Sequence, residues 1–238
     1  MSALSGRTAV VTGASRGIGA AIAKALSEQG ARVVMIARTE ARLRERADEI
    51  KGSIAITADV TDPASVERAT SKIVSELNGA PDILVNNAGV FSVAVAEETA
   101  VEQFMAILDT NLVAPFLFVR AFLADMKRRQ RGHIITIGSV ADRTIYSGNL
   151  AYSAAKFGLR AVHEVLRAEL RGTGVRTSLI SPAATNTEIW NAVTVTDPVN
   201  KPHSKRPMLE PDDVVRAVMF ALTQPDTVNV DELRLSHS

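Results

Sequence analysis

Three side chains in the second half of the chain have types and spacings suited to moving a proton. Ser139 lies thirteen positions before Tyr152, and Tyr152 lies four positions before Lys156. Residues four apart lie on one face of a helix, so the Tyr152 phenol and the Lys156 ammonium should be neighbours. An isolated phenol has a pKa of ~10, and a nearby ammonium favours the phenolate and lowers that pKa. Such a tyrosine can give a proton to a carbonyl oxygen or take one from an alcohol.

Ser139 follows a short apolar run, residues 133–138, which is expected to be a strand. Ligands of open α/β sheets collect at the carboxyl ends of strands, where this hydroxyl can hydrogen-bond the same substrate oxygen. A tyrosine and a lysine four apart are by themselves most often an amphipathic ring and a solvated cation. The pair indicates catalysis here because Ser139 and two further motifs accompany it, whereas Tyr146 has no lysine at that spacing.

A glycine-rich turn near the N-terminus is the first of these motifs. The strand expected over residues 8–12 runs into Gly13, and Gly17 and Gly19 open the helix that follows. Glycine lets the main chain bend tightly and approach a pyrophosphate, and the free amides of a helix N-terminus face the anion. The spacing Gly-x-x-x-Gly-x-Gly also suits an ordinary strand–turn–helix, but the strand and helix context favours a dinucleotide site.

The end of the second expected strand bears on the choice of cofactor. Sites that prefer NAD usually place an acid there, about 20 residues after the turn, to bind the ribose hydroxyls. Here residues 35–37 are Met, Ile and Ala, Arg38 follows, and Arg16 in the turn can reach the same region. Two guanidiniums can pair with phosphate oxygens, although solvated surface arginines are the plain alternative. The missing acid favours NADP(H) over NAD(H).

Short β-branched runs alternate with longer helical patterns along the chain. The runs are apolar on both faces, as strands covered on both sides must be, and comprise residues 8–11, 32–36, 54–57, 83–85, 133–137 and 175–180. Helices are expected over residues 17–29, 40–50, 63–77, 101–127, 152–171 and 211–222. This alternation predicts an α/β fold, a Rossmann-like doubly wound parallel sheet with helices on both faces, forming a single domain over residues 1–238. Residues 186–210 are irregular and proline-rich and are expected to cover the substrate as a loop.

Composition excludes several kinds of protein. The 238-residue chain has no cysteine, which excludes disulfides and thiolate metal sites, and no metal is expected. Lys plus Arg (27) nearly balances Asp plus Glu (26), so no overall field favours nucleic acid or membrane. Residues 1–7 lack the features of a secretory signal, and no apolar run is expected to span a bilayer. A cytoplasmic protein is expected.

The second accompanying motif, Asn86-Asn87-Ala88-Gly89, ends the fourth expected strand, where a plain turn is the alternative. With the glycine-rich turn, Ser139, Tyr152 and Lys156, it follows the order and spacing typical of the short-chain dehydrogenase/reductase family, which the chain resembles over nearly its whole length. The resemblance implies hydride transfer between NADP(H) and a carbonyl or secondary alcohol. It implies a cofactor site made of Gly13, Ser15, Arg16, Ile18, Gly19, Arg38, Asp59, Val60, Asn87, Ala88, Gly89, Tyr152, Lys156, Pro182 and Thr187.

Two further roles come from the resemblance. Asn111 would join Ser139, Tyr152 and Lys156 as a catalytic residue and hold a water that relays protons, although by chemistry alone it could be a helix cap. The carboxylate after the third expected strand, at position 59, would contact the adenine amine. It could equally cap the next helix, for which Asp62 is the better candidate.

The segment after the sixth expected strand departs from the family pattern at one position. That pattern is Pro-Gly followed by a threonine that contacts the nicotinamide carboxamide; Thr187 matches the threonine, but Ala183 replaces the glycine. The substrate pocket is expected to be mostly apolar, and its candidate residues are Phe91, Val140, Arg143, Tyr146, Ala183 and Trp190. The arginine in that set could anchor a carboxylate or simply be exposed.

The leading interpretation is an NADP(H)-dependent carbonyl or hydroxy-acid reductase that acts on a small carbonyl or alcohol substrate. A 3-oxoacyl-carrier-protein reductase is the main alternative, since a basic cluster could dock an acidic carrier or simply be a solvated helix end. That cluster comprises Lys127, Arg128, Arg129 and Arg131. Residues 228–235 differ from the Val-Asp-Gly-Gly-like ending usual in those reductases. A non-catalytic NADP-binding regulator would not need the intact serine, tyrosine and lysine.

A homodimer or homotetramer is expected. Residues 111–127 and the helix after Tyr152 carry apolar residues around more of their circumference than one sheet-facing stripe needs. A twofold mate would bury the excess, and the resemblance implies the same assembly.

Overall fold

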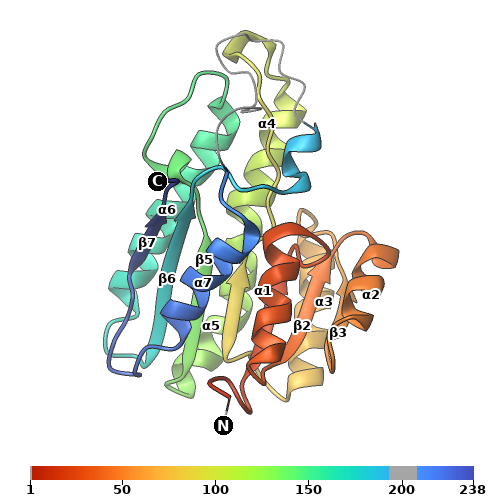
Figure 1. Cartoon of the computed structure of the whole chain (residues 1–238), viewed down its shortest axis with the longest axis vertical. Helices are drawn as coiled ribbons and strands as arrows, with labels where there is room; N and C mark the ends of the chain where they lie inside the picture. Colours follow the sequence, from red (N-terminus) through yellow and green to blue (C-terminus); the bar gives the residue numbers. More distant parts are fainter. Residues whose placement is uncertain (1, 193–207) are drawn as a thin grey trace.

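A parallel β-sheet forms the centre of the protein, whose computed structural model describes residues 2–192 and 208–238. Within these residues the sheet has seven strands in the order β3-β2-β1-β4-β5-β6-β7 (Figure 1). The strands are β1 (Thr8–Thr12), β2 (Arg32–Ala37), β3 (Ile54–Thr57), β4 (Ile83–Asn86), β5 (Gly132–Ile137), β6 (Val175–Pro182) and β7 (Glu232–Leu235). The expected single-domain parallel α/β fold is confirmed.

Helices cover both faces of this sheet. In the described part of the chain they are α1 (Gly17–Glu28), α2 (Glu40–Asp48), α3 (Pro63–Leu77), α4 (Val101–Leu108), α5 (Ala114–Arg128), α6 (Leu150–Glu169) and α7 (Pro211–Leu222). α1 and α7 pack together over one face, where they bury Ile22 and Val218. α3 and α5 pack over the opposite face around Phe118 and Phe122.

The strands β1 and β2 explain why the sequence contains continuous apolar runs. Val11 and Met35 point into the core shared with α1 and α7, whereas Val10 and Ile36 point into the core shared with α3 and α5. All four side chains are fully buried. A strand buried on both faces is mostly apolar rather than alternating, so the six expected strands are recognisable from sequence.

Two elements differ from the expectation. β7 is an edge strand beside β6, and it escapes detection because Glu232 and Arg234 interrupt its apolar pattern. The single helix expected over residues 101–127 is two helices, α4 and α5, joined by a π-helical turn, η2 (Asp109–Val113). Turns of this kind often mark functional positions, and Asn111 is the middle residue of this one.

The stretch from α4 to α5 also corrects an expectation about membranes. Val101–Arg128 is long and apolar enough, by length and composition, to be a membrane span, so the expectation that no such run exists is wrong. Its apolar side chains have another role in the described structure, because Phe118, Phe122 and Met126 are fully buried in the core.

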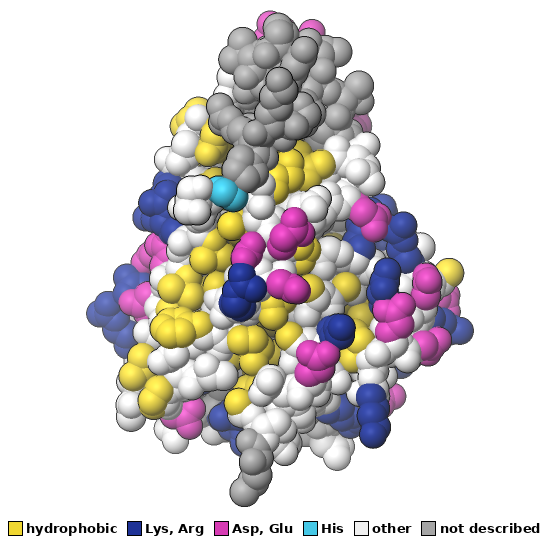
Figure 2. All heavy atoms as spheres, viewed as in Figure 1, with side chains coloured by type: hydrophobic (Ala, Val, Ile, Leu, Met, Phe, Trp, Pro, Cys, Tyr) yellow, Lys and Arg dark blue, Asp and Glu magenta, His cyan; other side chains and the backbone are white. Residues whose placement is uncertain are grey.

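The surface over α1 and α7 carries both signs of charge. Basic and acidic side chains lie among apolar ones over this face (Figure 2). This mixed face agrees with the near balance of 27 basic and 26 acidic residues in the chain.

Most of the loop expected to cover the substrate, residues 193–207, lies outside the described residues. Its described flanks are the short helix η4 (Glu188–Ala192) and the segment from residue 208 onward. A bridge between Thr185 and Leu209 brings the two flanks together.

His133 of β5 is a buried histidine whose protonation opposes folding. Its side chain is 3% exposed, and Nε2 lies 2.9 Å from Ser178 Oγ. Burial lowers the pKa of His133 from 6.5 to about 3. The folded protein therefore keeps this ring neutral at pH values where the unfolded chain takes up a proton.

We predict that His133 makes the free energy of unfolding fall by about 2 kcal/mol between pH 7 and pH 5. The folded pKa is depressed, so this stability is present at neutral pH and is lost as the pH falls below the ordinary histidine value. Urea unfolding followed by circular dichroism at both pH values measures the change. His133→Gln cannot titrate, and its stability should depend less steeply on pH; an identical slope in the variant would contradict the assignment.

Candidate active site

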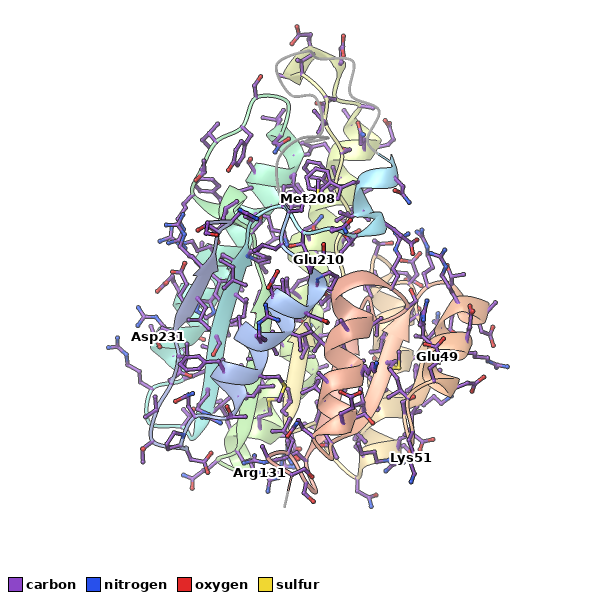
Figure 3. The ribbon with its side chains drawn as sticks, in the orientation of Figure 1. Glu49, Lys51, Arg131, Met208, Glu210 and Asp231 are labelled. Carbon is purple, nitrogen blue, oxygen red and sulfur yellow. The ribbon has the colours of Figure 1, made fainter. Side chains whose placement is uncertain are left out.

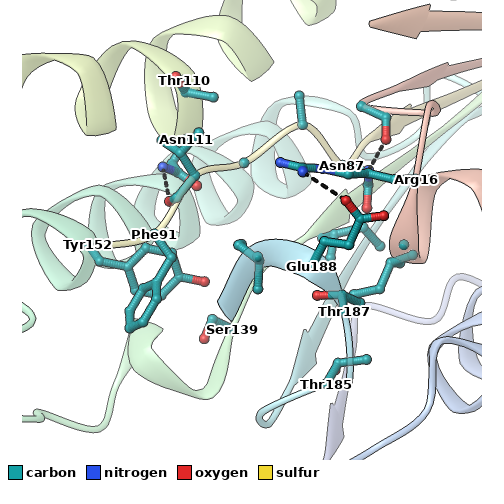
Figure 4. Close-up of a pocket in the computed structure, with 18 of the residues that line it drawn as sticks. Arg16, Asn87, Phe91, Thr110, Asn111, Ser139, Tyr152, Thr185, Thr187 and Glu188 are labelled. Atoms are coloured by element: carbon teal, nitrogen blue, oxygen red, sulfur yellow. Dashed lines mark hydrogen bonds and ion pairs between the residues drawn. The ribbon is translucent and has the colours of Figure 1, made fainter. Parts of the chain in front are cut away.

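A cavity of about 1150 Å³ opens along the carboxyl ends of the central strands (Figure 4). The strand order reverses between β1 and β4, and ligands of open α/β sheets bind at such a switch point. The cavity is lined by every expected catalytic and cofactor-binding residue except Gly19: Gly13, Ser15, Arg16, Ile18, Arg38, Asp59, Val60, Asn87, Ala88, Gly89, Asn111, Ser139, Tyr152, Lys156, Pro182 and Thr187.

The glycine-rich turn is tied to the segment after β4. Thr12 Oγ1 accepts hydrogen bonds from the backbone amides of Asn87 and Ala88, each at 3.0 Å. The Asn87 side chain donates in return to the backbone oxygens of Thr12, at 2.8 Å, and Gly13, at 3.3 Å. Asn87 therefore fixes the turn as well as lining the cavity.

Gly19 does not line the cavity itself but packs directly behind the glycine-rich turn. A Cβ at this position would lie 2.4 Å from both Asn87 Nδ2 and Gly13 O. The glycine is needed because the start of α1 packs directly against the amide that holds the turn. Gly13 and Gly17 have φ of 67° and 53°, a backbone conformation that favours glycine.

The three residues suited to proton transfer meet at the other end of the cavity. Lys156 Nζ lies 5.6 Å from the centroid of the Tyr152 ring and donates to Ile137 O at 3.0 Å. Ser139 lies close enough to the Tyr152 phenol to lower its pKa, and its Oγ accepts a hydrogen bond from Ala141 N at 3.1 Å. The helix spacing of Tyr152 and Lys156 and the strand-end position of Ser139 thus converge as the sequence predicts.

The pKa values differ from the expectation. The sequence predicts a phenol pKa depressed by Lys156, but burial raises the pKa of Tyr152 to about 12, and the nearby Ser139 hydroxyl offsets only part of that rise. Burial also lowers the pKa of the Lys156 ammonium to about 8. Desolvation penalises both charged forms, so it outweighs their mutual attraction in the protein alone.

Asn111 is held inside the π turn. It is 1% exposed, and its Nδ2 donates to Val90 O at 2.9 Å and to Ile107 O at 3.0 Å. Its Oδ1 has no hydrogen-bond partner among the residues described here. Asn111 is therefore not a helix cap, and its free acceptor suits a donor such as water.

Three arginines line the far end of the cavity. Arg16 and Arg42 both bind one carboxylate oxygen of Glu188, at 3.2 Å and 2.8 Å, and Arg38 also lines the cavity. The Glu188 carboxylate shows that this place holds an anion, so the arginines fit a phosphate group. Sequence reasoning missed Arg42 and Glu188, although Arg42 lies four positions after Arg38.

Asp59 does not cap the following helix. Its Oδ1 accepts from Thr61 N at 3.0 Å and from Thr61 Oγ1 at 2.7 Å, and these bonds, with the nearby Arg38 charge, lower its pKa. The cap of α3 is Asp62, which accepts from Ala64 N at 3.0 Å and Ser65 N at 3.1 Å.

Aromatic rings form the wall next to Tyr152. Phe91 meets the Tyr152 ring edge-on at 4.8 Å and meets the Trp190 ring in the same way at 5.1 Å. Val140, Tyr146 and the other apolar candidates also line the cavity: Phe91, Ala183 and Trp190.

Arg143 does not line the cavity, so its expected place in the substrate pocket is wrong. Arg143 Nε binds Asp142 Oδ1 at 2.8 Å, and Arg143 Nη2 binds Glu232 of β7. Two carboxylates therefore hold the guanidinium away from the substrate side.

The chain matches the family model described as short chain dehydrogenase over residues 7–197. The chain belongs to the short-chain dehydrogenase family. It is 34% identical over 235 residues to an uncharacterized oxidoreductase of Staphylococcus aureus (strain USA300), covering 98% of each protein. The family recognition is therefore confirmed, and the protein is an oxidoreductase.

Solved structures of the family share the whole fold. A metagenomic short-chain oxidoreductase in complex with NADP aligns over 100% of both chains with a TM-score of 0.85 and 34% identity. The closed form of a serine dehydrogenase complexed with NADP⁺ aligns over 96% of this chain and 94% of that one, with a TM-score of 0.89 and 34% identity. The cofactor in these neighbours agrees with the expectation of NADP(H).

We predict that Gly19→Ala weakens NADPH binding at least tenfold, since the added methyl group would displace the Asn87 amide that holds the turn. Titration of NADPH fluorescence measures this. Gly52→Ala is the matched control, because its Cβ would meet open space and its φ of 73° imposes only local strain. Equal NADPH affinity in Gly19→Ala and the wild type would show that the turn tolerates the displacement.

Proposed function

We propose that this short-chain dehydrogenase is an NADP(H)-dependent reductase of small carbonyl compounds, reversible toward the secondary alcohol. The observation that carries the proposal is the shape of the cavity. One continuous space joins the arginines at its far end to Ser139, Tyr152 and Lys156 at its near end. A cofactor with an extra phosphate at one end and a reactive ring at the other suits that arrangement.

The proton chemistry follows from the contacts of Tyr152. NADPH, when bound, supplies the hydride that the carbonyl carbon accepts. The Tyr152 phenol gives its proton to the carbonyl oxygen, and the Ser139 hydroxyl holds the same oxygen by a hydrogen bond. The Lys156 ammonium, fixed by Ile137 O, stabilises the phenolate that remains. The free Oδ1 of Asn111 would accept a hydrogen bond from a water, through which Lys156 would be reprotonated.

The cofactor would be held by the residues that the sequence indicates. The turn amides from Gly13 to Ile18 would bind the pyrophosphate, and Asp59 and Val60 would contact the adenine. Arg16, Arg38 and Arg42 would bind the 2′-phosphate in place of Glu188, which now pairs with two of them. Thr187 and Pro182 would contact the nicotinamide.

The described substrate side favours an apolar carbonyl compound. Phe91 and Trp190 form an aromatic wall beside Tyr152, and Arg143 is held by two carboxylates. The hydroxy-acid form of the reaction therefore lacks the carboxylate anchor that Arg143 would have supplied. A chain without cysteine suits the cytoplasm, which is the location we propose.

A 3-oxoacyl-carrier-protein reductase is less well supported. Three of the four residues of its expected docking cluster are engaged in ion pairs: Arg131 binds Asp82 at 2.9 Å, Arg129 binds Asp125 at 3.1 Å, and Arg128 also binds Asp125. Asp82 directly precedes β4, so the cluster lies at the amino ends of the strands, opposite the cavity (Figure 3). A carrier bound there would be far from Tyr152. NADPH oxidation with a panel of ketones separates a reductase from a non-catalytic NADP-binding regulator.

We predict that Tyr152→Phe lowers ketone reduction by roughly 10²–10⁴-fold, the usual worth of general acid–base catalysis. NADPH affinity should stay close to that of the wild type, because the variant loses only the exchangeable proton. Steady-state kinetics and NADPH fluorescence measure the two quantities. Tyr146→Phe, at the chain's other tyrosine, is the matched control. It leaves the Tyr152 proton in place and should not show this loss of ketone reduction.

We predict that the wild type prefers NADP(H) over NAD(H) by tenfold or more, since one charge-assisted hydrogen bond is worth about 1.5–3 kcal/mol. Arg38→Asp should erase or reverse the preference, because a carboxylate repels the phosphate and accepts from ribose hydroxyls. Glu188→Gln should act oppositely and tighten only NADP⁺, because it frees Arg16 and Arg42. The preference is measured as the ratio of kcat/KM with NADPH to kcat/KM with NADH. Equal kcat/KM values for the two cofactors in the wild type would rule out the prediction.

We propose that the protein is a homodimer or homotetramer built on α5 and α6. Phe116 on α5 and Phe157 on α6 are 48% and 39% exposed, and Val113 just before α5 and Val165 on α6 are exposed as well. Apolar side chains on two neighbouring long helices suit an interface with a twofold mate.

Replacement of Phe116 and Phe157 by Glu should therefore give a monomer, which light scattering at micromolar concentration measures. Phe220→Glu on α7 is the control, since Phe220 is 53% exposed but lies on the other face of the sheet. A monomeric wild type would contradict the assembly, whatever the variants do.

A further inference from the structure

A buried ionic cluster lies directly behind the turn that carries Ser139. We propose that Asp142 is a positioning residue of the active site, whose buried carboxylate fixes the Ser139 turn and supplies the counter-charge of the Lys156 ammonium. This inference rests on the proposed function, because it assigns a role in the same proton transfer. Asp142 belongs to the short helix η3 (Val140–Asp142), between Ser139 and the start of α6.

The contacts of Asp142 join three elements. The residue is 0% exposed, and its two carboxylate oxygens accept from different donors: Oδ1 from Arg143 Nε at 2.8 Å and Oδ2 from Ser181 Oγ of β6 at 2.6 Å. Arg143 in turn binds Glu232 of β7. A buried carboxylate that loses one of these partners is left uncompensated, so the cluster resists movement of the turn against β6 and β7.

The same turn sets the direction of the Ser139 hydroxyl. Asp142 N donates to Ser139 O at 2.9 Å, and Ala141 N donates to Ser139 Oγ at 3.1 Å. Ser139 and Asp142 therefore close one tight turn. The carboxylate that holds Asp142 against β6 thereby holds the hydroxyl that faces the substrate oxygen.

Asp142 and Lys156 both lie against the end of β5. A Cβ on Gly138 would lie 3.4 Å from Asp142 Oδ2, and the preceding residue, Ile137, accepts the Lys156 ammonium through its backbone oxygen at 3.0 Å. The carboxylate of Asp142 and the ammonium of Lys156 therefore lie against two consecutive residues of the chain, Gly138 and Ile137.

The charged and titratable groups that face Asp142 come from each element around it. They are Arg143 next in the chain, Glu232 on β7, and Tyr152 and Lys156 on α6. Burial lowers the pKa of Lys156, and the Asp142 charge counteracts that fall. Burial raises the pKa of Tyr152, and the same charge adds to that rise. Asp142 thus keeps Lys156 protonated and makes Tyr152 harder to ionise.

The first test is the pH dependence of alcohol oxidation by the whole enzyme, in which kcat/KM should rise as the Tyr152–Lys156 pair loses a proton. Asp142→Asn keeps the size of the side chain but removes its charge. Every proton of the pair then leaves more easily, so the rising limb should move to lower pH by on the order of 0.5–1 unit. A loss of turnover with the limb unmoved would reduce Asp142 to a structural residue and overturn the proposal.

Two matched variants separate charge from packing. Arg143→Gln leaves the Asp142 charge uncompensated, so the limb should move to higher pH, and a shared folding defect would not produce shifts of opposite sign. Asp82→Asn removes another buried carboxylate, which binds Thr8 and Arg131 at the amino ends of the central strands, far from Tyr152. That variant should leave the limb in place. Arg143→Gln also keeps the proposal testable if Asp142→Asn does not fold, since a limb that moves to lower pH there would contradict it.

A second measurement does not depend on turnover. In the full-length protein labelled with ¹³C-lysine, the resonance missing from Lys156→Arg should titrate near pH 8 in the wild type, and its midpoint should fall in Asp142→Asn. A shifted midpoint without ketone reduction would preserve the charge pairing and refute the proposed function. Normal ketone reduction with an unshifted midpoint would support the proposed function and refute the charge pairing of Asp142 with Lys156.

Discussion

The hydrogen bonds between the ends of β1 and β4 are the constraint on which the site depends. The Thr12 hydroxyl and the Asn87 amide join the ends of two adjacent strands, at the point where the strand order of the sheet reverses. The connections on either side of this point run away from one another, so a crevice forms at the strand ends. Gly19 and Gly13 allow the turn to pack against the same amide. The cavity therefore exists because this pair of strand ends is held together.

Burial has opposite consequences at the two ends of that cavity. At the near end it penalises both the Tyr152 phenolate and the Lys156 ammonium, so it raises the pKa of Tyr152 to about 12 and lowers that of Lys156 to about 8. At the far end Arg16 and Arg42 are half exposed, and the Glu188 carboxylate neutralises them. A ligand with a negative charge at one end can thus replace Glu188. A positive charge at its other end would lower the pKa of the Tyr152 phenol.

Several arginines outside the cavity form ion pairs with carboxylates, and these ion pairs bear on which substrates the protein can bind. Arg143 is occupied by Asp142 and Glu232, and Arg129 and Arg131 are occupied by Asp125 and Asp82. The first pairing removes a carboxylate anchor from the substrate side. The second neutralises part of the basic surface that an acidic carrier protein would need. The aromatic contact of Phe91 with Tyr152 and Trp190 is what remains beside the reacting group.

Local sequence pattern was enough to predict most of the fold and to indicate the candidate reactive residues. Strands buried on both faces are apolar throughout, a four-residue spacing places Tyr152 and Lys156 on one helix face, and glycines mark the turn after β1. Each of these signals depends on neighbours in the chain. β7, with Glu232 and Arg234 at an edge, and the π turn around Asn111 have no such signal.

Tertiary structure alone decided which charges pair and how burial shifts them. Arg42 meets Glu188 146 positions away, and Arg143 meets Glu232 89 positions away. Nothing near either arginine in the sequence specifies its partner. The raised pKa of Tyr152 likewise depends on how much apolar structure surrounds the phenol. A sequence pattern can place two groups side by side, but the solvent that the fold removes from them determines their charge.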